Sequence, residues 1–562
     1  MLENYNRWLN SSNLNKDLRD TMLTMNETEI NDSFYTNIKF GTAGMRGVMG
    51  PGTNRINIHT IRKANVGFAK YIVENGIDAM NRGVAISYDN RYMSQEFAYD
   101  SAKILASYNI KSYVFESLRP TPELSFAVRE LNCFGGIMIT ASHNPKEYNG
   151  YKLYDEKGCQ LVPALASRVT ELVNEVEDEL SIKAEITAEQ ESLIVKIGDS
   201  VDKKYIDKVM SIRLRPDVEK NIKIVFSPEH GASNLLVQKA LSEGGYNYLL
   251  VEEQATFDPA FSNTESPNPE DPRSYKLAME YAEKNNADLI LVCDPDGDRM
   301  GVVVKHNDEY VMMTGNQSGA VLLEYILSSR KELDQLPDNS IMFNTVVTSD
   351  LGEKIADKYG VQTEKTLTGF KFIGEKVAKY EINNEKTYVF GYEESYGSLI
   401  SDFVRDKDAT QACLMLAEAC AYYQQSNKTL IDVLNDLYQE LGYYNETQVA
   451  ITLDGQSGSE KIKSIISNLR VNPPQTIAGY KTVATEDYGK LERNDGGIVT
   501  NLVGFTPSEV LKFFLEDGSW IAIRPSGTEP KIKFYFCVKD DTAEKAISKT
   551  LKLEDVMQAF VK

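Results

Sequence analysis

The stretch 289–299, LILVCDPDGDR, joins five apolar residues to a turn that carries three aspartates at alternate positions. Five consecutive apolar residues are typical of a strand that is buried on both faces of a parallel sheet. The proline and glycine that follow prevent a helix, so the carboxylates of Asp294, Asp296 and Asp298 must share one tight turn. A hard divalent cation such as Mg²⁺ relieves their repulsion best and leaves room for a phosphate oxygen. The stretch therefore predicts a metal site at a sheet edge, in preference to a solvated acidic turn.

Helical and strand-like periods alternate along the rest of the chain, with turns rich in Gly, Pro or Asp between them. Residues 61–75 repeat apolar side chains at helical spacing and stop at Gly76, and residues 83–88 then form a strand-like run. Further strand-like runs lie at 222–226, 301–304 and 388–390. The pattern predicts an α/β fold, in which ligands gather at the loops beyond the carboxyl ends of the strands.

The length of 562 residues exceeds what one hydrophobic core supports, and it predicts roughly three to four domains. Polar stretches near 195–205 and 440–460 suggest two boundaries, and the residue pattern restarts after Val304. We expect four domains, over residues 1–203, 204–305, 306–440 and 441–562.

Composition excludes several classes of protein. The 61 basic and 82 acidic residues give a net charge of -21, which disfavours nucleic acid and requires that any phosphate be bound by local positive groups. No apolar run approaches the roughly 18 residues of a membrane span, and the N-terminus does not resemble a secretory signal, so we expect no membrane partner and a cytoplasmic location. The six cysteines form no Cys-x-x-Cys pair, which favours reduced, buried thiols over a zinc site or disulfides.

Three more loops carry residues suited to chemistry, although each by itself also fits an ordinary polar turn. The loop TASHNP at 140–145 presents Ser142 beyond a strand, but the adjacent His143 is poorly placed as its base, which disfavours acyl transfer. The loop GYEESYG at 391–397 offers two acids and a serine to sugar hydroxyls. The loop RPSGTEP at 524–530 offers an arginine, two hydroxyls and backbone N–H groups to a phosphate.

Taken together and in this order, the four loops make the chain similar to the α-D-phosphohexomutase superfamily, from about Gly41 to Tyr535. The resemblance implies an α/β protein with four domains around a central active-site cleft. The phosphorylated serine of the family matches Ser142, and its metal ligands match Ser142, Asp294, Asp296 and Asp298. The catalytic positions further match Arg46, His143, Lys152 and Arg299. The substrate contacts match Lys371, Glu393, Ser395, Arg524, Ser526, Gly527 and Thr528.

The same resemblance implies a sugar phosphate as the partner, Mg²⁺ as the cofactor and phosphoserine 142 as the carrier of the phosphoryl group. Tyr392, inserted in the sugar loop, and the lack of a histidine after Ser395 resemble the phosphoglucomutase branch. We therefore expect glucose 1-phosphate and glucose 6-phosphate to be interconverted through glucose 1,6-bisphosphate. Lys152 is the candidate to move the proton of the sugar hydroxyl, a role for which its pKa must be lowered.

Other functions remain open at this point. A phosphopentomutase or a phosphomannomutase would use the same fold, and the sequence does not indicate the oligomeric state. A metal-dependent phosphatase of the haloacid-dehalogenase type would use Asp294 as the nucleophile, but it leaves the Ser142, Glu393 and Arg524 loops unexplained. A sugar-phosphate sensor is disfavoured because every expected chemical residue is present. Dinucleotide, P-loop and His-Glu-x-x-His zinc motifs do not occur in the sequence.

Overall fold

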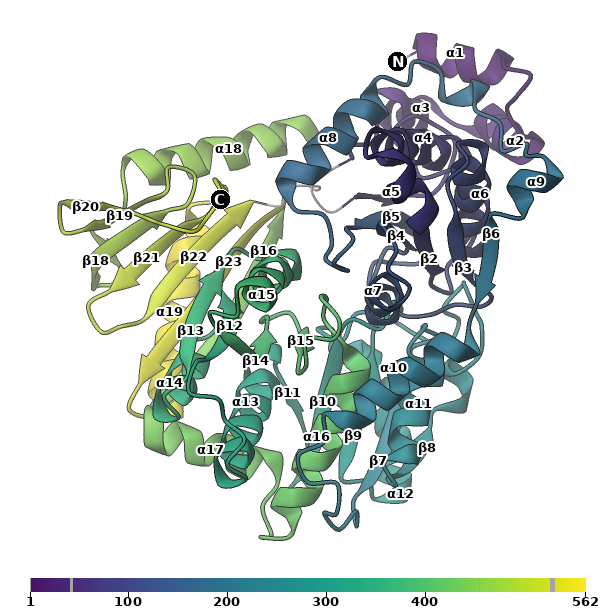
Figure 1. Ribbon diagram of the computed structural model, residues 1–562. Coiled ribbons are helices and arrows are strands. Elements are labelled where there is room, and N and C mark those ends of the chain that lie inside the picture. Colours follow the sequence, from purple (N-terminus) through teal and green to yellow (C-terminus); the bar gives the residue numbers. More distant parts are fainter. Residues whose placement is uncertain (1, 41–43, 454, 526–530, 562) are drawn as a thin grey trace. The chain divides into compact units, whose positions relative to one another are not determined.

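The computed structural model (Figure 1) describes residues 2–40, 44–453, 455–525 and 531–561. The chain divides into two compact units, and each is described by itself. Unit 1 consists of Met1–Ser318, Gln335–Ile341 and Gly369–Thr429, and unit 2 of Gly319–Asp334, Met342–Thr368 and Leu430–Lys562. Within the described ranges, no helix combines the length and the apolar character that crossing a membrane requires.

Unit 1 begins with three short helices that pack on one another. They are α1 (Leu2–Asn10), α2 (Lys16–Thr24) and α3 (Glu27–Phe34). Their buried side chains, among them Trp8, Met22 and Phe34, form a small core with Leu180. The indole N–H of Trp8 donates to Oε1 of Glu179 over 2.7 Å, so the helices are fixed to a later part of the same unit.

A mixed sheet of six strands follows, in the order β1-β5-β4-β2-β3-β6. Its strands are β1 (Met45–Val48), β2 (Val84–Tyr88), β3 (Ser112–Phe115), β4 (Gly135–Ile139), β5 (Tyr148–Tyr154) and β6 (Ile194–Ile197). Its helices are α4 (Ile58–Glu74), α5 (Gly76–Arg82), α6 (Ser94–Ser107), α7 (Thr121–Glu130), α8 (Pro163–Asn174) and α9 (Ala188–Glu191). The neighbours β2 and β4 run parallel, so the loops after both strands leave from one edge of the sheet.

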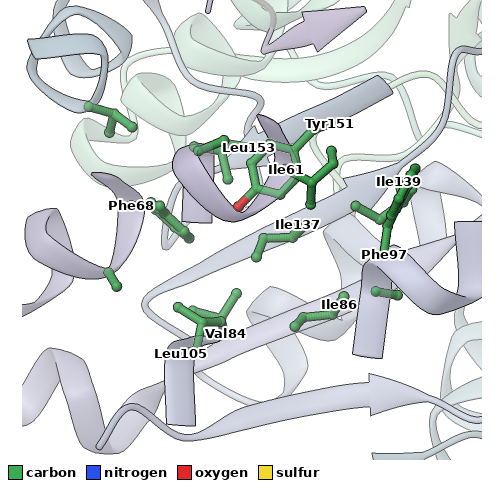
Figure 2. Close-up of a cluster of buried hydrophobic side chains, with 14 of the residues drawn as sticks. Ile61, Phe68, Val84, Ile86, Phe97, Leu105, Ile137, Ile139, Tyr151 and Leu153 are labelled. Carbon is green, nitrogen blue, oxygen red and sulfur yellow. The ribbon is translucent and has the colours of Figure 1, made fainter. Parts of the chain in front are cut away.

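The core of this sheet shows why its central strands β2 and β4 are mainly apolar (Figure 2). Successive side chains of a strand point to opposite faces, and every second residue of β2 and β4 enters one large cluster. Figure 2 shows its members Ile61, Phe68, Val84, Ile86, Phe97, Leu105, Ile137, Ile139, Tyr151 and Leu153. On the other face, a Cβ atom added at Gly136 would lie 2.8 Å from Val128 of α7. Both faces are therefore covered by helices, as the continuous apolar runs predict.

The helix expected over 61–75 is present as α4, and the strand expected over 83–88 is present as β2. Gly76 adopts a φ of 89°, a conformation that suits the residue after a helix. The chain does not leave the helical conformation there, however, because α5 begins at Gly76 itself. Periodicity alone did not reveal this second helix.

A second sheet of unit 1 has the order β11-β10-β9-β7-β8. Its strands are β7 (Lys223–Ser227), β8 (Asn247–Leu250), β9 (Leu289–Cys293), β10 (Met300–His306) and β11 (Glu309–Met313). Its helices are α10 (Asp199–Ser211), α11 (Asn234–Glu243), α12 (Lys276–Asn285) and α16 (Ala409–Gln424). The sheet continues through β11. The expected domain boundaries, including the one at residue 305, stay predictions.

A third sheet has the order β13-β12-β14-β15. Its strands are β12 (Ser340–Thr345), β13 (Gln362–Thr366), β14 (Thr387–Tyr392) and β15 (Ser398–Leu399). The helices of this region are α13 (Gly315–Glu332), α14 (Leu351–Lys358), α15 (Phe370–Asn383) and α17 (Leu430–Leu441). Within unit 1, β14 and β15 pair antiparallel and enclose the loop that begins at Glu393.

Unit 2 ends in a large antiparallel sheet, in the order β16-β23-β22-β21-β18-β19-β20, with β17 paired to β18. Its strands are β16 (Tyr443–Thr452), β17 (Thr476–Ile477), β18 (Tyr480–Asp487), β19 (Glu492–Asp495), β20 (Ile498–Asn501), β21 (Leu511–Leu515), β22 (Trp520–Pro525) and β23 (Lys531–Asp540). Helices α18 (Gly455–Val471) and α19 (Ala543–Ala559) contribute side chains to its core. The predicted α/β class is confirmed, with three mixed sheets and this C-terminal antiparallel one.

Candidate functional site

Ser142 lies in the loop after β4 and is buried, with 5% of its surface exposed. Its backbone has a φ of 53°, in the left-handed region that a serine seldom adopts. Its N–H donates to the hydroxyl of Thr140 over 2.8 Å, and its Oγ donates to Oδ2 of Asp294 over 3.0 Å. Nδ1 of His143 lies 3.1 Å from the same Oγ, within hydrogen-bond distance. The expectation that His143 is a poor base for Ser142 stays a prediction.

The predicted acidic turn is present directly after β9. One oxygen of Asp294 accepts the backbone N–H groups of Asp298 and Arg299, at 3.1 Å and 3.0 Å, and Gly297 takes a φ of 66° to close the turn. Carboxylate oxygens of Asp294, Asp296 and Asp298 all lie within 4.8 Å of one another, and the three side chains are buried. Oδ1 of Asp296 and Oδ1 of Asp298 have no hydrogen-bond partner among the described residues. Buried carboxylate oxygens in this arrangement fit a hard divalent cation.

The three carboxyl groups differ in their proton affinity because their neighbours differ. Burial and the charges of the other two aspartates raise the pKa of Asp294 well above its usual range. Burial and the charge of Asp296 also raise the pKa of Asp298. Burial alone would raise the pKa of Asp296 too, but the ammonium of Lys152, a hydrogen bond with Asp294 and the charge of Lys407 together lower that pKa. A divalent cation would relieve the same repulsion that raises the pKa of Asp294.

Two lysines contact the triad. Nζ of Lys152, on β5, lies 2.7 Å from Oδ2 of Asp296 and 3.7 Å from Oδ2 of Asp298. Nζ of Lys407 lies 3.0 Å from Oδ2 of Asp298 and 3.3 Å from Asp406. Burial lowers the pKa of Lys152, but the charges of Asp296 and Asp298 raise it by more, so the net shift is upward. The expectation of a lowered pKa at Lys152 is therefore wrong for this arrangement of charges.

Arg299 follows the triad and forms an ion pair with Glu270, with Nη1 2.8 Å from Oε1. Its pKa is raised, because the carboxylates around it outweigh the effect of burial. Arg46 lies on β1, opposite Gly150 of β5, and its side chain is exposed. Of these two predicted basic groups, the structure places Arg299 beside the metal loop.

The expected sugar loop follows β14. The carboxylate of Glu393 is buried and accepts the N–H of Gly369 over 2.7 Å, just before α15. Burial raises the pKa of Glu393 from 4.5 to about 7. Lys371 is buried in the first turn of α15, and Ser395 is half-buried. The N–H of Met300 on β10 donates to the carbonyl of Tyr396 over 3.1 Å, so the sugar loop and the metal loop lie side by side.

The expected phosphate loop belongs to unit 2. Arg524 is half-buried near the end of β22, opposite Lys533 of β23. Ser526, Gly527 and Thr528 lie outside the residues that the structure describes. The assignment of this loop to a phosphate therefore stays a prediction.

The sequence reasoning missed several residues around the triad. Thr121, at the start of α7, donates its hydroxyl to Oδ2 of Asp296 over 3.0 Å. Lys407, Glu270 and Arg91 were also missed. The only sequence signal for Arg91 is its position three residues beyond the end of a buried strand, and Lys407 is one charged residue in the run 401–408, SDFVRDKD. Neither signal indicates a partner distant in the chain.

The comparisons with known proteins agree with this geometry. Four family models, described as Phosphoglucomutase/phosphomannomutase alpha/beta/alpha domains I, II and III and C-terminal domain, match residues 37–180, 203–307, 314–441 and 468–552. A phosphoglucomutase of Staphylococcus aureus (strain MRSA252) is 38% identical over 527 residues, which cover 92% of this chain and 93% of the relative.

Solved structures share the fold at lower sequence identity. A putative phosphomannomutase from Thermus thermophilus has a TM-score of 0.70 at 20% identity, covering 94% of this chain and 99% of that one. An Aspergillus fumigatus N-acetylphosphoglucosamine mutase, in complex with GlcNAc-6P and magnesium, has a TM-score of 0.52 at 12% identity, covering 94% and 97%. With the family models matched in order and a relative of this identity spanning nearly the whole chain, the chain belongs to the phosphoglucomutase/phosphomannomutase family, within the α-D-phosphohexomutase superfamily.

Proposed function

We propose that this isomerase of the phosphoglucomutase type interconverts glucose 1-phosphate and glucose 6-phosphate, with Ser142 as the carrier of the phosphoryl group. The observation that carries the proposal is the 3.0 Å hydrogen bond from Oγ of Ser142 to Oδ2 of Asp294. It sets a hydroxyl nucleophile against a buried triad of carboxylates that fits a divalent cation. The 38% identity to a phosphoglucomutase supports glucose phosphate as the substrate.

The triad is the proposed site of Mg²⁺. Asp294, Asp296 and Asp298 would hold the ion, together with an oxygen on Ser142, and the unpartnered oxygens of Asp296 and Asp298 fit this role. When bound, Mg²⁺ withdraws negative charge from the transferring phosphoryl oxygens. A relative of the same fold from Aspergillus fumigatus was solved with magnesium, which supports the choice of metal.

Ser142 would exchange its phosphoryl group with the sugar in two steps. In the first, the bond from phosphorus to Oγ breaks while a free hydroxyl of the sugar monophosphate attacks, which gives glucose 1,6-bisphosphate. In the second, Oγ attacks the other phosphate of the turned bisphosphate and the sugar oxygen leaves. Phosphoserine is thereby restored, so glucose 1,6-bisphosphate is both the intermediate and the activator.

Lys152 would handle the proton of the sugar oxygen. Because Asp296 and Asp298 keep Lys152 charged, it is ready to donate a proton to a departing oxygen. To accept a proton from an attacking hydroxyl, it must first lose the charge that these carboxylates stabilise. His143, within hydrogen-bond distance of Oγ, and Arg46 would assist electrostatically.

The remaining predicted residues would bind the substrate. Glu393, Ser395 and Lys371 would contact the sugar, and Arg299 would hold charge near the reacting phosphate. Arg524, Ser526, Gly527 and Thr528 would hold the phosphate that does not react. The same loops must accept the sugar in two orientations, because the two phosphates exchange roles.

One experiment tests the proposal. Purified protein with Mg²⁺ and a trace of glucose 1,6-bisphosphate is assayed against the 1-phosphates of glucose, mannose, glucosamine and ribose, and peptide mass spectra measure phosphate at Ser142. We expect the fastest turnover with glucose 1-phosphate, phosphate at Ser142, and loss of turnover in Ser142→Ala but not in the exposed control Ser192→Ala. Faster turnover of ribose 1-phosphate or mannose 1-phosphate would instead indicate a phosphopentomutase or a phosphomannomutase. Release of inorganic phosphate would indicate a metal-dependent phosphatase. Normal turnover of Ser142→Ala would refute the mechanism.

A further inference from the structure

Arg91 is a buried arginine that donates most of its hydrogen bonds to the loop that carries Ser142. It follows β2, at the same edge of the sheet as the loop after β4, and its side chain is inaccessible to solvent. A guanidinium has five N–H donors in a rigid fork. One of them, on Nε, bonds Oδ2 of Asp89 at 3.1 Å. The others bond backbone carbonyls: Nη2 to Ser142 and Asn144, each at 2.5 Å, and Nη1 to Pro145 at 2.8 Å and Tyr148 at 3.0 Å.

Asp89 holds the same loop from its other end. Its carboxylate accepts the hydroxyl of Thr140 over 2.7 Å and that of Ser94 over 2.8 Å. The hydroxyl oxygen of Thr140 in turn accepts the N–H of Ser142. The Asp89 and Arg91 pair therefore fixes both the N–H and the carbonyl of Ser142, one through Thr140 and the other directly.

This double attachment explains the unusual backbone of Ser142. A φ of 53° is unfavourable for serine and persists only when surrounding bonds impose it. Four hydrogen bonds from one rigid cation to consecutive turns of the loop supply such a constraint. With the backbone fixed, Oγ of Ser142 is directed at Oδ2 of Asp294.

The contacts of Arg91 also reach the part of unit 1 that carries the metal loop. Its guanidinium lies 5.3 Å from the ring centroid of Phe261, within the range of a cation–π contact. The neighbouring Asn90 donates to the carbonyl of Asp258 over 3.1 Å. The serine loop is thus fixed with respect to segment 258–261, which belongs to the same matched domain as Asp294.

We propose that Arg91 is a positioning residue for phosphoryl transfer, which holds Ser142 in the conformation that aims Oγ at the metal triad. The inference rests on the proposed function, because it takes Ser142 as the nucleophile. A purely structural role would instead change only the stability of the domain. Lysine cannot replace Arg91, since a single ammonium cannot reach four carbonyls and a carboxylate in a plane.

The test compares Arg91→Met and Arg91→Lys with the control Arg62→Met. Arg62 belongs to the same domain and, from α4, forms a two-point ion pair with Asp100, at 2.8 Å and 2.7 Å. Rapid-quench experiments measure transfer of labelled phosphate from glucose 1,6-bisphosphate to Ser142, and steady-state assays give kcat and KM. We expect both Arg91 variants to slow the transfer and kcat about 100-fold with KM changed less than about threefold, because the nucleophile is misplaced while the substrate contacts remain. Arg62→Met should keep kcat within about twofold of the wild-type value, even if its Tm falls as much as the Tm of the Arg91 variants.

A rescue experiment covers the case in which the Arg91 variants fold poorly. Arg91→Ala leaves space for free guanidinium ion. We expect millimolar guanidinium to raise the rate of phosphoryl transfer to Ser142 in this variant at least about tenfold, whereas methylammonium should not raise it. Transfer to Ser142 at the wild-type rate in Arg91→Met, or an equal loss of kcat in Arg62→Met, would overturn the inference. The proposed function fails separately, in the wild-type protein, if no phosphate reaches Ser142 there.

Discussion

Oγ of Ser142 and Oδ2 of Asp294 lie 3.0 Å apart, although 152 positions separate the two residues in the chain. Ser142 follows β4 and Asp294 follows β9, so loops from two different sheets meet at one hydroxyl. The other oxygen of Asp294 is already held by two backbone N–H groups, which immobilises the carboxylate that Ser142 contacts. Changes in either loop should therefore affect phosphoryl transfer and ion binding together.

Asp296→Asn should weaken Mg²⁺ binding at least about tenfold and lower kcat, because it removes both a ligand and a charge next to the transferring group. Titration calorimetry with Mg²⁺ and the dependence of kcat on Mg²⁺ concentration measure the two effects. The control is Asp288→Asn, whose carboxylate accepts the N–H of Lys223 away from the triad. An unaltered dependence on Mg²⁺ in Asp296→Asn would remove the metal assignment.

Lys407→Met should lower kcat/KM about 10- to 100-fold without weakening Mg²⁺ binding. The substitution removes a positive charge 3.0 Å from Asp298, close to where the phosphate must bind. It also removes a cation that competes with Mg²⁺ for that carboxylate, so the affinity for Mg²⁺ should hold or increase. Steady-state kinetics and calorimetry measure the two effects, with the exposed Lys203→Met as the control. Weaker Mg²⁺ binding at unchanged kcat/KM would show that Lys407 only arranges Asp298.

Arg524→Ala should lower kcat/KM roughly 30- to 1000-fold, equally in both directions, because a charge-assisted contact to the non-reacting phosphate is lost in each half of the cycle. The variant should also release glucose 1,6-bisphosphate and require more of it for activity. Kinetics in both directions, with and without added bisphosphate, measure these effects. The control Arg470→Ala removes an arginine of unit 2 that pairs with Asp487 and Glu509. Wild-type kinetics in Arg524→Ala would refute the phosphate site.

The wild-type protein should lose stability as pH rises, and Glu229→Gln should abolish this pH dependence. Burial raises the pKa of Glu229 from 4.5 to about 8, and its Oε2 has no hydrogen-bond partner within the described part of the chain. Between these two values the folded state keeps the proton that the unfolded chain has released. Stability therefore falls as pH rises through this window and levels off above it.

Calorimetric Tm values of both proteins at pH 6 and pH 9 test this. The free energy involved is on the order of 2 to 4 kcal/mol, so the wild type should lose several degrees more than the variant. The exposed Glu243→Gln should behave like the wild type. Parallel pH curves for wild type and Glu229→Gln would contradict the assignment.

The sequence by itself determined those features whose residues are neighbours in the chain. The run 289–293 and the aspartates after it required a strand and a tight acidic turn, and β9 and the buried triad confirm both. The order of the four loops indicated the superfamily, and the family models and the Staphylococcus aureus relative confirm it. Local geometry suffices here, because strand and turn are set by residues within one or two positions of each other.

Only the tertiary structure decided how distant residues meet and what charge they carry. The sheet topology brings Lys407 to Asp298 and Arg91 to Ser142. The periodicity and spacing of residues in the sequence do not encode that topology. The pKa of Lys152 was expected to be lowered, but it depends on the balance between burial and two carboxylates that approach from another sheet. The electrostatic energy of a charged group depends on its distance from other charges and on the surrounding dielectric. Both quantities are set only when the chain folds, so the sequence alone does not give the pKa.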